Sequence, residues 1–306
     1  MVMMMTLLYW LVREARGLTG LQIGDMLNLE RKARADQYLL DSGVFYRQYG
    51  SGQSTERPWP LSHIPVLIAQ DDWANVSSAL IQRADLLEAV MADLYGDNTL
   101  VGSGHLPPSL VAGNPEWLRP MVGVRPRSGH YLHFLAFEIG RGPDGQWWVL
   151  ADRAQAPSGA GYALENRLVL SRAFPNLYNA MNVQRLAPFF GAFRDSLANA
   201  AHRDDPRICL LTPGPFSETY FEQAHLARYL GLLLVEGDDL VVRDGQVYVR
   251  TIAGLKRADV IWRRVDADFI DPLEMNSASQ LGVPGLFEAI RAGGVVVSNM
   301  PGSGLI

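Results

Sequence analysis

The chain has 306 residues, 48% of them hydrophobic and 19% charged, and a formal net charge of −5 at pH 7. This length is sufficient for two domains with cores of ordinary size, and the acidic balance argues against a basic surface that would hold a nucleic-acid backbone. Cys209 is the single cysteine, which excludes a disulfide framework and a cysteine-ligated metal site within this sequence.

Residues 1–60 are predicted to form a helical and irregular N-terminal extension. The opening run MVMMMTLLYWLV is too short to span a bilayer and lacks the basic region and cleavage site of a signal peptide, which favours a cytoplasmic location without membrane contact. Residues 1–41 are predicted to be helical, with Gly43 as the helix stop. The stretch 45–65 is predicted to be an ordered loop in which Trp59 is a packing anchor.

Residues 61–204 are predicted to form a first unit built around a β-hairpin. Apolar residues recur at three- and four-residue spacing over 71–96, which predicts a helix. Two apolar strands, 130–140 and 146–153, are separated by the sequence RGPDG, and its Asp-Gly pair is typical of a hairpin turn. Further helices follow the hairpin and are interrupted at Pro175.

Polar side chains gather beside this hairpin and in the Pro-Ser-Gly loop that follows it. Glu138 and Asp152 lie near strand ends that a short turn brings together, so both carboxylates could reach one hard cation that bridges phosphate oxygens. In the alternative interpretation one of them is a solvated edge residue and the other pairs with Arg153 or Arg167. The sequence leaves both interpretations open.

The polar triplet Glu165-Asn166-Arg167 comes after that loop. A polar triplet directly after a Pro-Ser-Gly loop is typical of a site close to phosphate. Glu165 and Arg167 could equally cap or bridge the first turn of a helix. These two interpretations also stay open.

Residues 205–306 are predicted to form an α/β unit that begins after the polar run HRDDPR. Apolar strands such as ICLLT, LLLVE, DVIWRR and VVVSN alternate with the helices SETYFEQAHLARYLG and VPGLFEAIRAG, which favours parallel strand pairing. The pair Asp244-Gly245 predicts the turn of a further hairpin, and Ser217 and Gly231 are the expected ends of the first helix.

The turn PGPF and the helix start after it form a second candidate site, with Gly214, Ser217 and Glu218 as substrate-binding residues. The free backbone N–H groups of a helix start bind anions, but Glu218 and Glu222 in the first turn would repel phosphate and suit an amine. The sequence contains neither a dinucleotide-binding fingerprint nor a P-loop, which disfavours a Rossmann-like nucleotide-sugar enzyme. Ordinary packing of a strand-helix unit is the alternative.

Several of these runs together resemble the circularly permuted ATP-grasp type 2 family, which is similar to glutathionylspermidine synthetase. They are ERPWPL, WWVLADRAQAPSGAGYALENR, LLTPGPFSETYFEQAHLARYLG, RRVDADFIDPLE and VPGLFEAIRAGGVVVSN. The resemblance extends from about Gly43 to the end of the chain. It implies an α/β fold with α+β elements, in which a partial ATP-grasp domain with the hairpin (61–204) precedes a pre-ATP-grasp-like substrate domain (205–306).

The resemblance also implies an ATP-dependent carboxylate-amine ligase that acts through an acyl phosphate, with ATP and Mg²⁺ as cofactors. Its substrates would be a small amine and a carboxylate or peptide. The expected roles are Mg²⁺ binding by Glu138 and Asp152, catalysis by Arg153, Ser158 and Arg167, and cofactor binding by Glu165 and Asn166.

Two departures from the family pattern qualify this expectation. Ala151 and Arg153 stand where related sequences have Glu and Asn, so either Asp152 takes over the metal or the site is altered. The chain has only two lysines, Lys32 and Lys256, and related chains continue past this one with the lysines that clasp ATP, so a C-terminally truncated ligase is expected. The alternative is a non-catalytic binding or assembly module that retains the fold.

Overall fold

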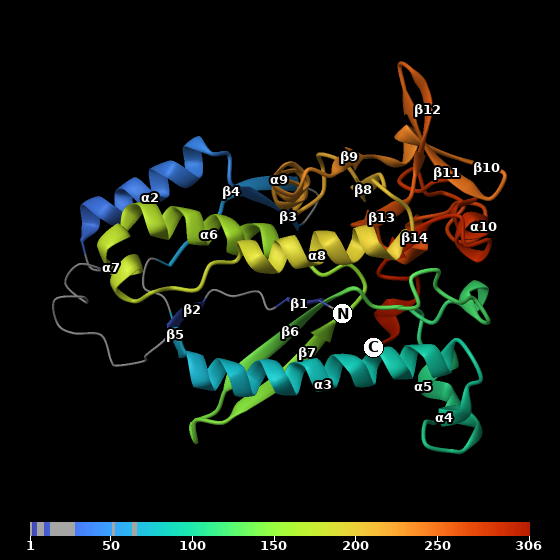
Figure 1. Cartoon of the computed structure of the whole chain (residues 1–306), viewed down its shortest axis with the longest axis horizontal. Helices are drawn as coiled ribbons and strands as arrows, with labels where there is room; N and C mark the ends of the chain where they lie inside the picture. Colours follow the sequence, from blue (N-terminus) through green and yellow to red (C-terminus); the bar gives the residue numbers. More distant parts are fainter. Residues whose placement is uncertain (1, 5–8, 13–27, 51–52, 63–65) are drawn as a thin grey trace.

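The computed structural model describes residues 2–4, 9–12, 28–50, 53–62 and 66–306 (Figure 1). A four-stranded parallel sheet forms the centre of the second half of the chain, in the spatial order β14-β13-β8-β9. Its strands are β8 (Ile208–Leu211), β9 (Leu233–Val235), β13 (Val260–Arg263) and β14 (Val296–Ser298). β8, β13 and β14 are buried throughout, as expected for parallel strands covered by helices. The predicted parallel pairing of these strands is confirmed.

The connections of this sheet create a switch in chain direction. The chain leaves β8 through α9 (Tyr220–Leu230) to reach β9 on one side, and leaves β13 through α10 (Leu286–Arg291) to reach β14 on the other. The carboxyl ends of β8 and β13 therefore flank a topological switch point, where open α/β sheets bind ligands.

The ends of α9 agree only in part with the prediction. Gly231 closes the helix in the left-handed conformation, with φ of 68°, and this expectation is confirmed. Ser217 is not the N-cap, because the helix starts three residues later, after Thr219. The hydroxyl of Ser217 instead accepts a hydrogen bond of 3.1 Å from Gln223 Nε2.

A three-stranded antiparallel sheet projects from the body at the upper right of Figure 1. It consists of β10 (Leu240–Arg243), β11 (Gln246–Thr251) and β12 (Gly254–Ala258). Positive φ angles at Asp244 and Gly245 confirm the predicted turn between β10 and β11. β12 has no counterpart in the predicted elements, because the short, partly polar run GLKRA carries no apolar alternation.

The predicted hairpin is confirmed as β6 (Phe134–Arg141) and β7 (Trp147–Arg153), which pair in antiparallel fashion. β1 (Val2–Met4) pairs with β6 in parallel, so β7 is the edge of a sheet with the order β1-β6-β7. The long helix α3 (Gln70–Leu94) crosses this sheet (Figure 1), and its apolar residues share one core with Leu135 and Phe137.

Asn299, just after β14, attaches this hairpin to the parallel sheet. Its Oδ1 accepts hydrogen bonds from the backbone N–H groups of His133 (2.7 Å) and Phe134 (2.9 Å). Its Nδ2 donates to the carbonyl oxygens of Phe134 (2.6 Å) and Ala154 (2.5 Å). One buried amide thus contacts both strands of the hairpin sheet at their ends nearest the parallel sheet.

The N-terminal region differs from its prediction in three places. β1 (Val2–Met4) is a strand where a helix was predicted. β2 (Tyr9–Val12) pairs with β5 (Val66–Ala69) and is a strand rather than part of a helix, since a four-residue apolar run has no periodicity that separates the two. The expected loop contains a hairpin of β3 (Phe45–Gly50) and β4 (Gln53–Pro58), whose polar sequence hides its strand character.

The helix prediction before this hairpin is confirmed for α2 (Leu29–Asp41), which Asn28 caps. Residues 13–27 of the predicted helical stretch lie outside the described residues. Trp59 is a packing anchor, as predicted: its ring stacks on Tyr162 with centroids 4.0 Å apart.

Further helices follow the β6-β7 hairpin and the long helix α3. α6 (Ala160–Ala173), α7 (Pro175–Ala180) and α8 (Ala187–Ala200) follow the hairpin, and the break at Pro175 is confirmed. The short helices α4 (Thr99–Gly102) and α5 (Pro108–Ala112) lie beyond the end of α3 (Figure 1). None of the helices in the described ranges is long and apolar enough to cross a bilayer.

Candidate functional site

Two adjoining cavities lie at the carboxyl ends of β8 and β13. The first, of about 850 Å³, is bordered by the β6-β7 hairpin, and the second, of about 450 Å³, by the loop before α9. Ala156, Ser158 and Asp266 border both cavities. We call the two together the switch-point cleft; its walls include residues 155–158, Pro213 with residues 217–219, residues 264–266 and the β6-β7 hairpin.

A buried ion pair lies behind the wall of the switch-point cleft, which Arg264 borders. Arg264, directly after β13, places Nη2 3.0 Å from Oε1 of Glu222 on α9, and its Nη1 donates to the carbonyl oxygen of Pro157. Oε2 of Glu222 accepts from the backbone N–H groups of Gly159 (2.7 Å) and Gly161 (3.1 Å). Burial raises the pKa of Glu222, and Arg264 and the two N–H groups oppose this shift.

This ion pair determines what the start of α6 can bind. A helix start is a natural anion site because its first N–H groups lack partners within the helix. Here a carboxylate of the protein already occupies two of them. The Pro-Ser-Gly loop before α6 is therefore capped from α9, and the capped N–H groups are not free for a phosphate.

Close packing holds the carboxylate in this position. A Cβ on Gly161 would lie 2.7 Å from Cβ of Glu222, which is closer than side chains pack. Glycine at this position therefore lets α6 and α9 approach until the Glu222 carboxylate reaches the end of α6.

The rim of the first cavity is acidic. Glu116 and Asp266 both border it, and burial raises the pKa of Glu116, with further contributions from Asp268 and Asp266. Oε2 of Glu116 is buried and has no hydrogen-bond partner among the described residues. Gln155 closes the rim by accepting a 3.0 Å hydrogen bond from the backbone N–H of Ala267. A carboxylate rim of this kind suits an ammonium group better than an anion.

Sequence reasoning did not assign a role to Glu116, Gln155, Arg264 or Asp266. Three of them, Gln155, Arg264 and Asp266, stand in runs that carried the family resemblance, DRAQAPSG and RRVDADF. The signal available in the sequence was the position of RRVD directly after a buried strand, where the carboxyl edge of a parallel sheet lies.

Both predicted metal ligands border the first cavity, but the strand geometry separates them. The strand register pairs Asp152 with Phe137 and Glu138 with Ala151, so the two carboxylates leave the hairpin on opposite faces. Asp152 accepts two hydrogen bonds from Arg83 on α3, of 2.8 and 2.6 Å. No group of three or more metal-ligating side chains occurs among the residues that the structure describes. In this structure each carboxylate is paired with an arginine, and the shared ion stays a prediction.

Glu138 has an arginine partner of its own. Arg153, a predicted catalytic residue, donates to Oε1 of Glu138 from Nε (2.9 Å) and Nη2 (2.6 Å). Both side chains are more than half exposed and border the first cavity. The alternative interpretation agrees in part with this geometry: one carboxylate, Glu138, pairs with Arg153, but Asp152 pairs with Arg83 instead of being a solvated edge residue.

The predicted triplet Glu165-Asn166-Arg167 lies in the second turn of α6 and is buried. Glu165 Oε2 is 3.5 Å from Nε2 of His225, and Asn166 Oδ1 accepts a 2.9 Å hydrogen bond from Trp59 Nε1. Burial lowers the pKa of Arg167, and its Nε and Nη1 have no hydrogen-bond partner among the described residues. None of the three borders the switch-point cleft.

The predicted residues around PGPF divide into two groups. Ser217 and Glu218 border the second cavity together with Ser158, so three predicted side chains from distant parts of the sequence lie at one site. Gly214 does not border it. Its φ of 94° and its N–H hydrogen bond of 3.0 Å to Thr212 Oγ1 make it a turn residue.

The chain matches the circularly permuted ATP-grasp type 2 family over residues 65–306. An uncharacterized protein of Mycobacterium tuberculosis is 44% identical over 251 residues, which cover 81% of this chain and 28% of that protein. Another from the same species is 39% identical over 281 residues, which cover 90% and 50%. An uncharacterized protein of Synechocystis is 39% identical over 269 residues, which cover 87% and 56%. The chain thus spans about half or less of the length of these relatives.

Among solved structures, the chain is similar to a glutathione synthetase-like effector from Globodera pallida, in its apo form. The TM-score is 0.51 at 15% identity, and the match covers 86% of this chain and 62% of that one. At this identity the likeness concerns the fold alone, and it agrees with the mixed helical and parallel-sheet architecture. On the match over residues 65–306, the chain belongs to the circularly permuted ATP-grasp type 2 family.

Proposed function

We propose that this chain carries the substrate-binding part of an ATP-dependent ligase that joins a carboxylate to an amine through an acyl phosphate. The observation that carries the proposal is the switch-point cleft. Ser158, Ser217 and Glu218 meet there with Asp266 at the carboxyl ends of two parallel strands. Family membership supports the ATP-dependent reaction class, and the acidic rim supports an amine as one substrate.

The side chains of the switch-point cleft that lack an ion-pair partner among the described residues could each contact a different group of the substrates. Ser158 borders both cavities, so a substrate that extends from one to the other passes its hydroxyl, which can donate to a carboxylate oxygen. Asp266 and Glu218 offer charge to an ammonium group. Glu116 has a raised pKa because it is partly buried near other acids, which suits a carboxylate that accepts a proton from the attacking amine.

ATP would supply the phosphoryl group that activates the carboxylate, and Mg²⁺ would neutralise the phosphate charge. The described residues do not fit the expected Mg²⁺ site, because Glu138 and Asp152 are each bonded to an arginine. The proposal therefore assigns to this chain substrate binding and proton transfer, and no step through a metal.

The rival function, a non-catalytic binding or assembly module, is favoured by the same arginine pairs. A hairpin whose two acids are neutralised by Arg83 and Arg153 is what a family member would have if it retained the fold without metal chemistry. The switch-point cleft would then bind a ligand without turning it over.

The test is ADP release by the full chain in Mg-ATP, with a panel of carboxylates offered together with amino acids and polyamines. We expect release that requires both a carboxylate and an amine, and a loss of at least tenfold in Asp266→Asn, which corresponds to about 1.4 kcal/mol. Asp195→Asn, at an exposed position of α8, is the matched control and should release ADP like the wild type. Background release under every combination would favour the binding module.

A further inference from the structure

A third cavity lies on the other side of the Ser217-Glu218 segment. It has a volume of about 290 Å³, and its two walls are residues 42–47 with Glu56, and residues 215–228 around the start of α9. We call it the hairpin groove, because β3 and β4 form one wall. Ser217 and Glu218 border both the hairpin groove and the second cavity of the switch-point cleft.

The two walls of the hairpin groove are attached to each other. The backbone N–H of Arg47 on β3 donates a 3.0 Å hydrogen bond to the carbonyl oxygen of Glu218, and the Tyr49 hydroxyl donates to the carbonyl oxygen of Phe216. The Arg47 guanidinium lies 5.4 Å from the centroid of the Phe216 ring. The first wall also precedes residues 65–306, the part matched by the family. The hairpin groove is therefore formed by one wall inside the family match, residues 215–228, and one wall outside it, residues 42–47 with Glu56.

Four charged side chains of both signs border this small cavity: Arg47 and Arg228, and Glu56 and Glu218. Within the described part of the chain, none of the four has an ion-pair partner within 4 Å, unlike the charges of the β6-β7 hairpin. Two cations and two anions that do not pair with each other can each bind a ligand group of opposite charge. The cavity lies at the lower limit of small-molecule sites, about 300–1,000 Å³, which favours a ligand smaller than a nucleotide.

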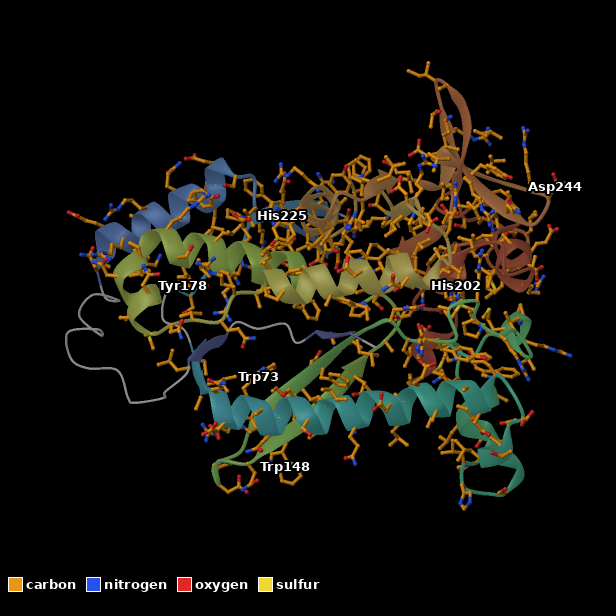
Figure 2. The ribbon with its side chains drawn as sticks, in the orientation of Figure 1. Trp73, Trp148, Tyr178, His202, His225 and Asp244 are labelled. Carbon is orange, nitrogen blue, oxygen red and sulfur yellow. The ribbon has the colours of Figure 1, made fainter. Side chains whose placement is uncertain are left out.

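His225 on α9, labelled in Figure 2, also borders the hairpin groove. Its side chain is 8% exposed and stacks on Phe221 with centroids 5.5 Å apart. Nε2 has no hydrogen-bond partner, although Glu165 Oε2 lies 3.5 Å away. Burial, together with the nearby Arg228, lowers the pKa of His225. Nε2 lies on the side of Glu165, which does not border the hairpin groove, so His225 serves as a reporter in the wall of the groove.

We propose that the hairpin groove binds a small zwitterion, an α-amino acid or a dipeptide. Its carboxylate lies between Arg47 and Arg228 and its ammonium group between Glu56 and Glu218. Binding itself needs no turnover. The further step, that this zwitterion is a ligase substrate whose reacting group reaches the switch-point cleft past Ser217 and Glu218, rests on the proposed function.

The experiment titrates the full chain with glycylglycine and the common L-α-amino acids, followed by the imidazole ¹⁵N signals of His225 in NMR spectra. We expect at least one of these zwitterions to shift the signals saturably. Its N-acetylated and C-amidated derivatives, which each lose one charge, should bind at least tenfold more weakly. If no zwitterion in the set shifts the signals, or if the derivatives bind equally well, the proposal is overturned.

Variants separate this site from the switch-point cleft. Arg228→Gln and Glu56→Gln change exposed side chains, so both should fold, and each should weaken zwitterion binding at least tenfold. Arg34→Gln, on the exposed part of α2, is the matched control and should bind as the wild type does. Saturable binding without ADP release would support the zwitterion site in the hairpin groove and contradict the ligase proposal. ADP release with unchanged His225 signals would support the ligase proposal and contradict the zwitterion site.

Discussion

The β6-β7 hairpin and the carboxyl edge of the parallel sheet use their charged residues differently. On the hairpin, Glu138 and Asp152 each bind an arginine whose side chain is 63% or 41% exposed. At the sheet edge, one ion pair, Arg264 with Glu222, is almost completely buried, while Asp266 and Glu218 have no ion-pair partner among the described residues. The carboxylates of the hairpin are neutralised by neighbouring arginines. At the sheet edge, one buried ion pair positions the unpaired carboxylates of Asp266 and Glu218.

This difference shows which charges are available to a ligand. Exposed ion pairs contribute about 0–1 kcal/mol and can exchange partners, whereas a buried pair is costly to break because it leaves an uncompensated charge. Sequence patterns do not distinguish an exposed ion pair from a buried one. The difference follows from which strand face or helix face each side chain occupies.

The largest effect is expected from breaking the buried pair. Glu222→Gln leaves Arg264 buried without a counter-charge, and we expect the free energy of unfolding to fall by about 3–5 kcal/mol, measured by urea denaturation. The matched control is Glu218→Gln, an exposed residue four positions earlier, which should change stability by no more than about 0.5 kcal/mol. Equal effects in the two variants would contradict the assigned role of Glu222.

A smaller effect is expected from separating α6 and α9. Gly161→Ala places a methyl group against Glu222, and overpacking of this kind costs about 1–3 kcal/mol. Gly191→Ala on α8 is the control, because no atom lies within 4 Å of its added Cβ and alanine favours a helix. Thermal unfolding should show a lower midpoint for the first variant only; a stabilised Gly161→Ala protein would refute the close approach.

The smallest effect is expected on the hairpin. A double-mutant cycle of Glu138→Gln and Arg153→Gln should give a coupling energy between about 0 and 1 kcal/mol, because both side chains are more than half exposed. Denaturation with and without Mg²⁺ completes the measurement. A marked Mg²⁺ stabilisation that disappears in Glu138→Gln would restore the metal interpretation.

Much of the fold was predictable because local signals and tertiary structure agree. The apolar strand ICLLT, the helix that ends at Gly231 and the Asp144-Gly145 hairpin all carry short-range patterns that the structure retains. The run YWLV was misread because four apolar residues fit a helix and a strand equally well. The β3-β4 hairpin was missed because its strands are polar.

The candidate site was predictable only in part. Ser158, Ser217 and Glu218 were identified, since each stands in a Gly- or Pro-containing loop beside a predicted strand or helix. Glu222 was read from the sequence as a group that would repel phosphate, but its carboxylate turns inward to Arg264 and α6. The inward rotation depends on Gly161 and on a strand about 40 residues later, and no local pattern encodes it.

The four hydrogen bonds of the Asn299 amide have a consequence for how the protein gains its structure. The residue lies at the end of β14, yet its partners stand about 145 and 165 positions earlier in the chain. Before β14 is in place, the backbone groups of His133 and Phe134 lack this partner. The early and late parts of the chain therefore complete each other's hydrogen bonding, and folding of the hairpin is coupled to the arrival of a distant strand.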